Sequence, residues 1–170
     1  MLTKIYIKNF ALIDELEVDF SNGFSTITGD TGSGKSILLN ALSIVTGKRV
    51  GHKILKNDSI KCVVEVEFNL TKLNIKNIFD LNNIDYFDQT ILRREILPGG
   101  KSRSFINDTP ANLDVMKLIG EKLIDIHTQH ESLVISNDNF FFLLIDNLSK
   151  QQSIVKNFSE NFSLYKELCL

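Results

Sequence analysis

One eight-residue stretch constrains this chain more than any other. Residues 29–36 read Gly-Asp-Thr-Gly-Ser-Gly-Lys-Ser and fit the pattern G-x-x-x-x-G-K-[ST] without a mismatch. The pattern requires a strand before it and a helix after it. Residues 24–28 predict a short buried strand, and residues 37–46 predict a helix with a broad apolar face that stops at Gly47. The stretch therefore predicts a phosphate-binding loop in an α/β fold.

The residue types in this loop suit a nucleoside triphosphate. Glycines let the backbone turn its N–H groups inward, which forms an anion-binding nest at the start of a helix. Lys35 can then reach the β- and γ-phosphates, and the Ser36 hydroxyl can ligate Mg²⁺. The predicted contact residues are Gly29, Asp30, Thr31, Gly32, Ser33, Gly34, Lys35 and Ser36.

The bulk properties are those of an ordinary globular protein. With 170 residues the chain is one domain by length, and its net charge of −2 gives no general attraction to nucleic acid. Cys62 falls on an apolar strand position, which favours a buried thiol over a disulfide. Cys62 and Cys169 are two isolated cysteines without metal-ligand spacing, which indicates a reducing cytosol. The N-terminus has no apolar core of a signal peptide, and residues 140–145 are too short an apolar run to cross a membrane.

Alternation of apolar and polar residues predicts most of the strands. It predicts strands over residues 2–10, 13–20, 60–70, 89–96 and 103–106, with a short helix within 71–88. Two antiparallel strands thus precede the strand that leads into the loop. We expect residues 59–107 to form an antiparallel subdomain inserted after the loop helix, within a mixed sheet.

Basic residues recur in this predicted insert and after the loop helix. Arg93, Arg94, Lys101 and Arg103 fall on the insert, and Arg49 follows the helix. They either contact phosphates of a nucleotide or of DNA, or they are ordinary solvated charges on a strand face and a loop. The sequence leaves both interpretations open.

The region after the insert predicts a capped helix, a strand and a polar loop. Asn112 can cap a helix whose apolar face carries Leu113, Met116 and Ile119. Residues 123–127 then predict a strand, and residues 128–131 predict a polar loop that carries Gln129. His127, His130 and Glu131 are chemically able to bind a metal, but their spacing is only weak evidence for a metal site.

The last part of the chain repeats at helical spacing. The seam consists of Leu148, Gln151, Val155, Phe158, Phe162, Tyr165 and Cys169, in alternating steps of three and four. Such a heptad seam predicts either the start of a coiled coil or one amphipathic helix packed on the globular body. We expect a head segment over residues 1–147 and the start of a coiled-coil arm over residues 148–170, in a chain that continues beyond Leu170.

The order of these parts resembles the N-terminal half of an ATP-binding-cassette (ABC) head of the SMC type. Within that class it looks most like the RecN family of bacterial DNA repair proteins. The segments that carry the resemblance are residues 7–14 (Ile-Lys-Asn-Phe-Ala-Leu-Ile-Asp), 28–38, 91–96, 100–107 and 125–131 (Asp-Ile-His-Thr-Gln-His-Glu). They follow one another in the family's order over nearly the whole chain.

The resemblance implies a P-loop ATPase with an α/β fold that uses ATP and Mg²⁺. It assigns catalytic roles to Lys35 and Gln129, places Ser36 and Gln129 at Mg²⁺, and brings Asn9 and Phe10 near the nucleotide. The implied function is recombinational repair of DNA double-strand breaks in the bacterial cytoplasm, at the nucleoid. The implied partners are the C-terminal half of the head, a second head in a homodimer, and DNA, with no membrane.

The same resemblance places two catalytic parts outside this chain. We expect the strand that ends in Asp-Glu (the Walker B strand) and the Leu-Ser-Gly-Gly signature to lie in the C-terminal half, so that the chain alone hydrolyses little ATP. Two alternatives remain open. One is an unrelated P-loop kinase or NTPase that is complete in this chain and uses Asp125. The other is a non-catalytic nucleotide-sensing or scaffold module.

Overall fold

The computed structural model describes residues 1–29, 35–49, 54–126, 145–146, 148–149 and 152–169. The chain divides into two units, Met1–Ile126 and His127–Leu170. The first unit contains β1 (Leu2–Phe10), β2 (Ile13–Asp19), α1 (Lys35–Val45), β3 (Cys62–Asn69), α2 (Lys76–Leu81), β4 (Gln89–Ile96), β5 (Ser102–Ile106), β6 (Thr109–Ala111) and α3 (Leu113–Leu123). The second unit contains α5 (Gln152–Leu168).

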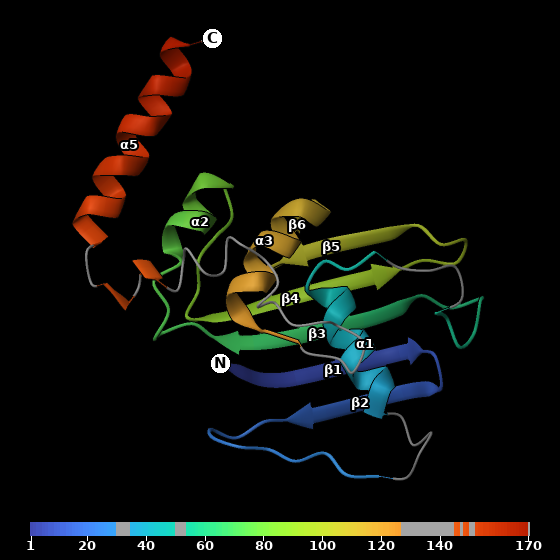
Figure 1. The fold of residues 1–170 in the computed structure, drawn as a ribbon. Helices are drawn as coiled ribbons and strands as arrows, with labels where there is room; N and C mark the ends of the chain where they lie inside the picture. Colours follow the sequence, from blue (N-terminus) through green and yellow to red (C-terminus); the bar gives the residue numbers. More distant parts are fainter. Residues whose placement is uncertain (30–34, 50–53, 127–144, 147, 150–151, 170) are drawn as a thin grey trace. The chain divides into compact units, whose positions relative to one another are not determined.

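The first unit is built on one six-stranded sheet in the order β2-β1-β3-β4-β5-β6 (Figure 1). Each neighbouring pair is antiparallel. Because β1 pairs with β3, with Ile5 opposite Val66, the strands of the predicted insert continue the sheet that β1 and β2 begin. The predicted strands at 2–10, 13–20, 60–70, 89–96 and 103–106 are all present, and the short β6 is an addition.

The alternation that predicts the strands also defines the two faces of the sheet. One face is apolar and buried, with Ile7, Val64 and Leu92 fully covered. The other face carries charged side chains that pair across strands, such as Lys4 with Glu17 at 2.6 Å. Side chains on a strand alternate between the two faces of a sheet. The apolar face of this sheet can therefore pack against one layer of helices, while the charged face remains in water.

Helices α1 and α3 cover the apolar face (Figure 1). The Asn112 side chain accepts a hydrogen bond from the Val115 amide and caps α3, as predicted. Helix α1 ends where Gly47 takes a φ of +102°, and the Lys48 amide donates to the Ser43 carbonyl. This is the hydrogen-bond pattern of a Schellman motif, and the positive φ explains the glycine.

Two predicted strands are not formed. Residues 24–28, before the loop, pair with no described strand, and Phe24 is 94% exposed. Ile124, after α3, has an extended backbone (φ −148°, ψ 138°), but residues 124–126 also have no strand partner; residue 127 lies outside the described part of the chain. The reason is the same for both: an extended apolar segment becomes a strand only when a neighbouring strand supplies its hydrogen bonds. With neither of these segments in the sheet, the described pairings are antiparallel and not mixed.

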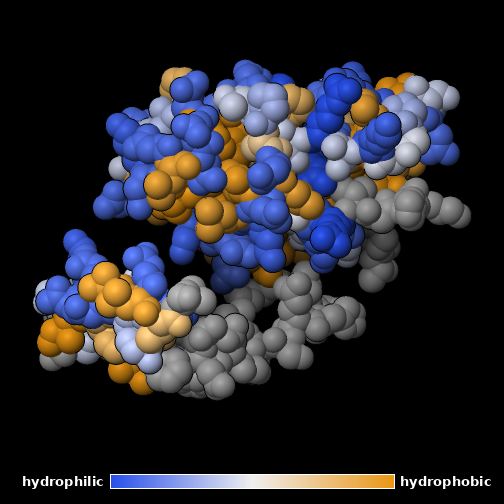
Figure 2. Space-filling model, turned by 90° about the horizontal axis from the view of Figure 1, so that it is seen from above, coloured by the Kyte–Doolittle hydropathy of each residue, from blue (hydrophilic) through white to orange (hydrophobic). Residues whose placement is uncertain are grey.

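Helix α5 carries four residues of the predicted seam, Val155, Phe158, Phe162 and Tyr165, on an exposed surface, and Gln151 lies outside the described residues. The rings of Phe158 and Phe162 stack at 5.8 Å, and those of Phe162 and Tyr165 at 6.5 Å. All three side chains are largely exposed, and Figure 2 shows hydrophobic side chains among hydrophilic ones on the surface of this helix. None of the helices in the described residues is long and apolar enough to span a membrane.

Candidate functional site

Of the loop at residues 29–36, the structure describes Gly29, Lys35 and Ser36, and these residues lie at the start of α1. Lys35 and Ser36 are the first two residues of the helix. The Lys35 ammonium donates a hydrogen bond to the Gly29 carbonyl, and the Ser36 side chain is exposed. No carboxylate occupies the first turn of α1, so the positive end of the helix dipole is available to an anion. Residues 30–34 lie outside the described residues.

A cavity of about 310 Å³ runs alongside the same helix. Its α1 wall is formed by Ile37, Asn40 and Ile44, which share one helix face because they are three and seven residues apart. Its other lining residues are Phe10 and Ala11 at the end of β1, Ile54, and the cations Lys48 and Arg49. The cavity therefore has an apolar floor and two cations, beside the helix that begins with Lys35.

Asn9 holds one wall of this cavity in place. Asn9 is buried, with only 6% of its surface exposed. It donates to the carbonyls of Asn57 (2.9 Å) and Ile60 (2.6 Å), and it accepts from the Asn57 amide at 2.8 Å. The amide of Ala11 donates to the Ile54 carbonyl at 2.7 Å. The side-chain amide of Asn9 is therefore hydrogen-bonded to backbone groups of the chain. Of Asn9 and Phe10, only Phe10 lines the cavity.

Several candidate residues lie outside the described part of the chain. They are Asp30, Thr31, Gly32, Ser33, Gly34, His127, Gln129, His130 and Glu131. Their roles stay predictions. Among the described residues, no three His, Cys, Asp or Glu side chains lie close enough together to hold a metal ion. Asp125 is exposed and follows α3 in a segment without strand pairing.

The basic residues of the predicted insert do not form one patch. Arg93 and Arg94 are neighbours on β4 and therefore point to opposite faces of the sheet. Arg93 contacts Asp108 at 3.0 Å and Glu65 at 3.8 Å, and its guanidinium lies 4.7 Å from the Phe105 ring centre. Arg94 is buried on the helix-covered face. The alternation of the predicted strand at 89–96 already separates the two, because Arg94 falls on the same face as Leu92 and Ile96 and Arg93 on the other.

One apolar run that ends in Asp-Glu does occur in this chain, because residues 10–15 read Phe-Ala-Leu-Ile-Asp-Glu. This run spans the turn between β1 and β2 and so is not a continuous strand. Asp14 pairs with Lys56 at 2.6 Å, and Glu15 accepts a hydrogen bond from Tyr6 at 2.6 Å, which raises the pKa of Tyr6 to about 12. Both carboxylates are thus engaged by other side chains of the chain, so this run is not a Walker B strand.

Together, the loop sequence, the helix that follows it and the sheet beneath define the class of this protein. It has the fold of the N-terminal lobe of an ABC-type ATPase head, and residues 29–36 have the sequence of a phosphate-binding loop. A family model described as "AAA domain" matches residues 4–168, and the chain belongs to that family. The chain is also similar to curated DNA repair proteins named RecN.

The relatives that support this statement cover almost the whole chain. A DNA repair protein RecN from Haemophilus influenzae is 31% identical over 99% of this chain and 31% of its own length. The RecN of Bacillus subtilis is 33% identical over 99% of this chain and 30% of its own length. The chain thus spans about a third of the length of these relatives.

A solved structure agrees with the fold. It comes from work described as structural biochemistry of ATP-driven dimerization and DNA-stimulated activation of SMC ATPases. It superimposes with a TM-score of 0.55 at 23% identity and covers 90% of this chain and 96% of that chain. At this level of identity the likeness concerns the fold, which is the α/β ATPase head expected from the sequence.

Proposed function

We propose that this chain binds Mg²⁺·ATP as one half of a divided ATPase site. The observation that supports this most is the arrangement around α1. Lys35 and Ser36 stand at its first turn, and the 310 Å³ cavity with Lys48 and Arg49 lies along the same helix. Lys35 would bind the β- and γ-phosphates, Ser36 would hold Mg²⁺, and the apolar floor beside Phe10 would take the base and sugar.

The groups that complete the site come from elsewhere under this proposal. Gln129 would bind Mg²⁺ and place the attacking water, since an amide accepts through oxygen and donates through nitrogen. The Asp-Glu strand and the signature motif would come from the C-terminal half of the head and from a second head. ATP would then hold two heads together, and its hydrolysis would release them.

The whole protein would act in recombinational repair of DNA double-strand breaks, at the bacterial nucleoid in the cytoplasm. The RecN relatives at about 30% identity support this role. Residues 1–147 would form the head segment with its antiparallel region at 59–107, and residues 148–170 would begin a coiled-coil arm. The exposed aromatic seam of α5 suits a second helix as its partner.

Experiments distinguish this proposal from the two alternatives, a complete P-loop kinase and a non-catalytic scaffold module. A complete P-loop kinase would need Asp125 at a strand end, and the described residues 124–126 have no strand partner. A phosphoryl-acceptor assay tests the kinase hypothesis. A pure scaffold would bind ATP but never hydrolyse it, even when the C-terminal half of the head is added.

ATP binding itself is tested by equilibrium titration of the chain with a fluorescent ATP analogue and Mg²⁺. Lys35→Ala should weaken binding roughly 10- to 100-fold, because it removes a charge-assisted contact of about 1.5–3 kcal/mol. The matched control is Lys76→Ala at the start of α2, which should leave the affinity unchanged. Equal affinity of Lys35→Ala and the unaltered chain would contradict the proposal.

A further inference from the structure

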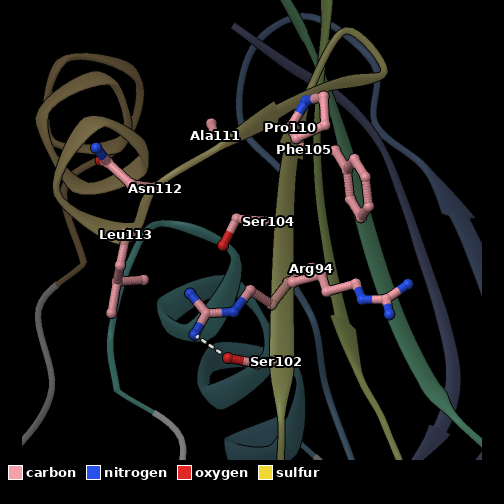
Figure 3. A pocket seen from close by; sticks show the side chains of 9 residues that line it. Arg94, Ser102, Ser104, Phe105, Pro110, Ala111, Asn112 and Leu113 are labelled. Carbon is pink, nitrogen blue, oxygen red and sulfur yellow. Dashed lines mark hydrogen bonds between the residues drawn. The ribbon is translucent and has the colours of Figure 1, made fainter.

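A second cavity, of about 470 Å³, lies at the end of the sheet where β5 and β6 meet the start of α3. Its lining includes Arg94, Ser102, Ser104, Pro110, Asn112 and Leu113. Figure 3 shows the Arg94 side chain crossing from β4 toward Ser102 and Ser104, with Leu113 on the far side. The cavity shares no residue with the one beside Lys35.

Arg94 occupies a position that the sheet pattern assigns to the core. It is opposite Val64 on β3 and Ser104 on β5, between the buried Leu92 and Ile96 on its own strand. Only 3% of its surface is exposed. Burying a guanidinium among aliphatic side chains is costly unless its charge and its N–H groups find partners.

The partners of Arg94 within the described residues are few. Its Nη2 donates to the Ser102 hydroxyl at 2.9 Å, while its Nε and Nη1 have no hydrogen-bond partner. These two atoms carry three of the five N–H donors of the group. None of the ion pairs of the described residues involves Arg94, whereas the adjacent Arg93 contacts three carboxylates. Burial lowers the pKa of Arg94, but a guanidinium remains charged at neutral pH.

We propose that this cavity is a binding site for a phosphate group, held by Arg94 together with the hydroxyls of Ser102 and Ser104. The Nε and Nη1 atoms have almost no accessible surface, so a phosphate in the cavity reaches their N–H groups when the Arg94 side chain turns toward it. A phosphate then offers several acceptor oxygens, and guanidinium binds it with well-matched geometry. Hydroxyl groups supply further donors. The cavity lies in the size range of small-molecule sites, so it can accept the phosphate of a small ester or one phosphate of a nucleic-acid strand.

This site is additional to the proposed nucleotide site, and it does not depend on it. It also explains why a residue that interrupts an apolar strand face is an arginine. An anion would supply the charge that no described carboxylate provides. The position would otherwise be filled more favourably by an aliphatic side chain.

The test measures thermal stability against inorganic phosphate in Lys35→Ala, a background in which the loop lysine no longer contributes. Phosphate at about 100 times its dissociation constant should raise the melting temperature by roughly 5 °C or more. Adding Arg94→Met should reduce this shift to the general contribution that phosphate makes in every variant. Because Met fills the space without a charge, this variant should melt at or above its parent in phosphate-free buffer, which keeps it folded for the comparison.

The control for this test is Arg93→Met in the same background, which alters the opposite face and should keep the shift. Phosphate also stabilises proteins in general by exclusion from their surface, and that contribution is the same in every variant. An equal shift with and without Arg94, or no shift in the parent, would overturn the proposal. Two further arms, a nucleoside monophosphate and a single-stranded oligonucleotide, show which source of phosphate protects the Arg94-containing chain.

Discussion

Gly120 in α3 lies directly against Thr46 at the end of α1. A Cβ placed on Gly120 would stand 2.8 Å from the Thr46 Cβ and 2.9 Å from its Cα and carbonyl oxygen. A second glycine makes a similar close contact in the other direction. A Cβ placed on Gly47, after α1, would stand 2.7 Å from the Cα of Lys117 in α3. The two helices that cover the sheet thus meet through two glycines, and this close contact fixes the end of α1.

Gly120→Ala should therefore destabilise the chain, although alanine is the better helix former by about 1 kcal/mol. The added methyl group meets backbone atoms that cannot move without shifting a helix, and overpacking of this kind costs about 1–3 kcal/mol. We expect a net loss of up to about 2 kcal/mol in the free energy of unfolding, measured by urea denaturation.

The matched control for this helix is Glu121→Ala at the next residue. Glu121 is exposed and makes only a 3.7 Å ion pair with Lys117. Its replacement should change the free energy of unfolding by less than about 0.5 kcal/mol. If Gly120→Ala proved more stable than the parent chain, the close contact of α1 and α3 would be refuted.

Asn9→Asp should be strongly destabilising, because it places a carboxylate where Asn9 now donates to two carbonyl oxygens. Loss of these bonds and burial of the charge should cost at least about 3 kcal/mol at pH 7. Asn9→Gly keeps the positive φ of 53° and loses only the hydrogen bonds, so its cost should be smaller, about 1–3 kcal/mol. Urea titrations of both variants measure this order, and the reverse order would contradict the role given to Asn9.

The sequence predicts an element of this fold correctly where the pattern that defines the element is local to the segment. The alternation in residues 60–70 predicts β3, and Asn112 predicts the start of α3, because strand faces and caps are local. Residues 24–28 have a comparable apolar pattern but no strand beside them. Pairing depends on distant residues, so the pattern alone gives the wrong result there.

The candidate site divides in the same way. The loop motif predicts Lys35 and Ser36 at the start of a helix, because motif and helix are contiguous. The cavity lining combines Phe10, Ile54 and Arg49 from three separate segments, and no local pattern brings these together. Arg94 was predicted as part of a basic cluster. Its burial follows from its place between Leu92 and Ile96 on the apolar face of β4, a signal that the alternation of residues 89–96 carries.

The two cysteines should differ sharply in reactivity. Cys169 is exposed, while Cys62 is fully buried on β3 and burial raises the pKa of its thiol to about 12. A thiol reagent at pH 8 should label one cysteine at once and the second only when the chain unfolds. Rapid labelling of both thiols in the native chain would contradict the burial of Cys62.

The same thiol makes stability depend on pH in a defined direction. The pKa of Cys62 is about 12 in the folded chain and about 8.5 in an unfolded one, so only the unfolded chain releases this proton between those values. The contribution of Cys62 to stability is complete below pH 8.5 and falls by up to about 1.4 kcal/mol per pH unit above it. Cys62→Val should flatten the decline in urea titrations from pH 8 to 10, and Cys169→Ser should not.

The most direct test of a divided site is ATP turnover by the chain alone, under conditions in which ATP binding is saturated. Because the Asp-Glu strand and the signature motif are assigned to the rest of the head, we predict that Mg²⁺·ATP binds but that phosphate release stays at the level of Lys35→Ala. Clear Mg²⁺-dependent turnover that disappears in Lys35→Ala would contradict this account, because the chain would then hold a complete active site.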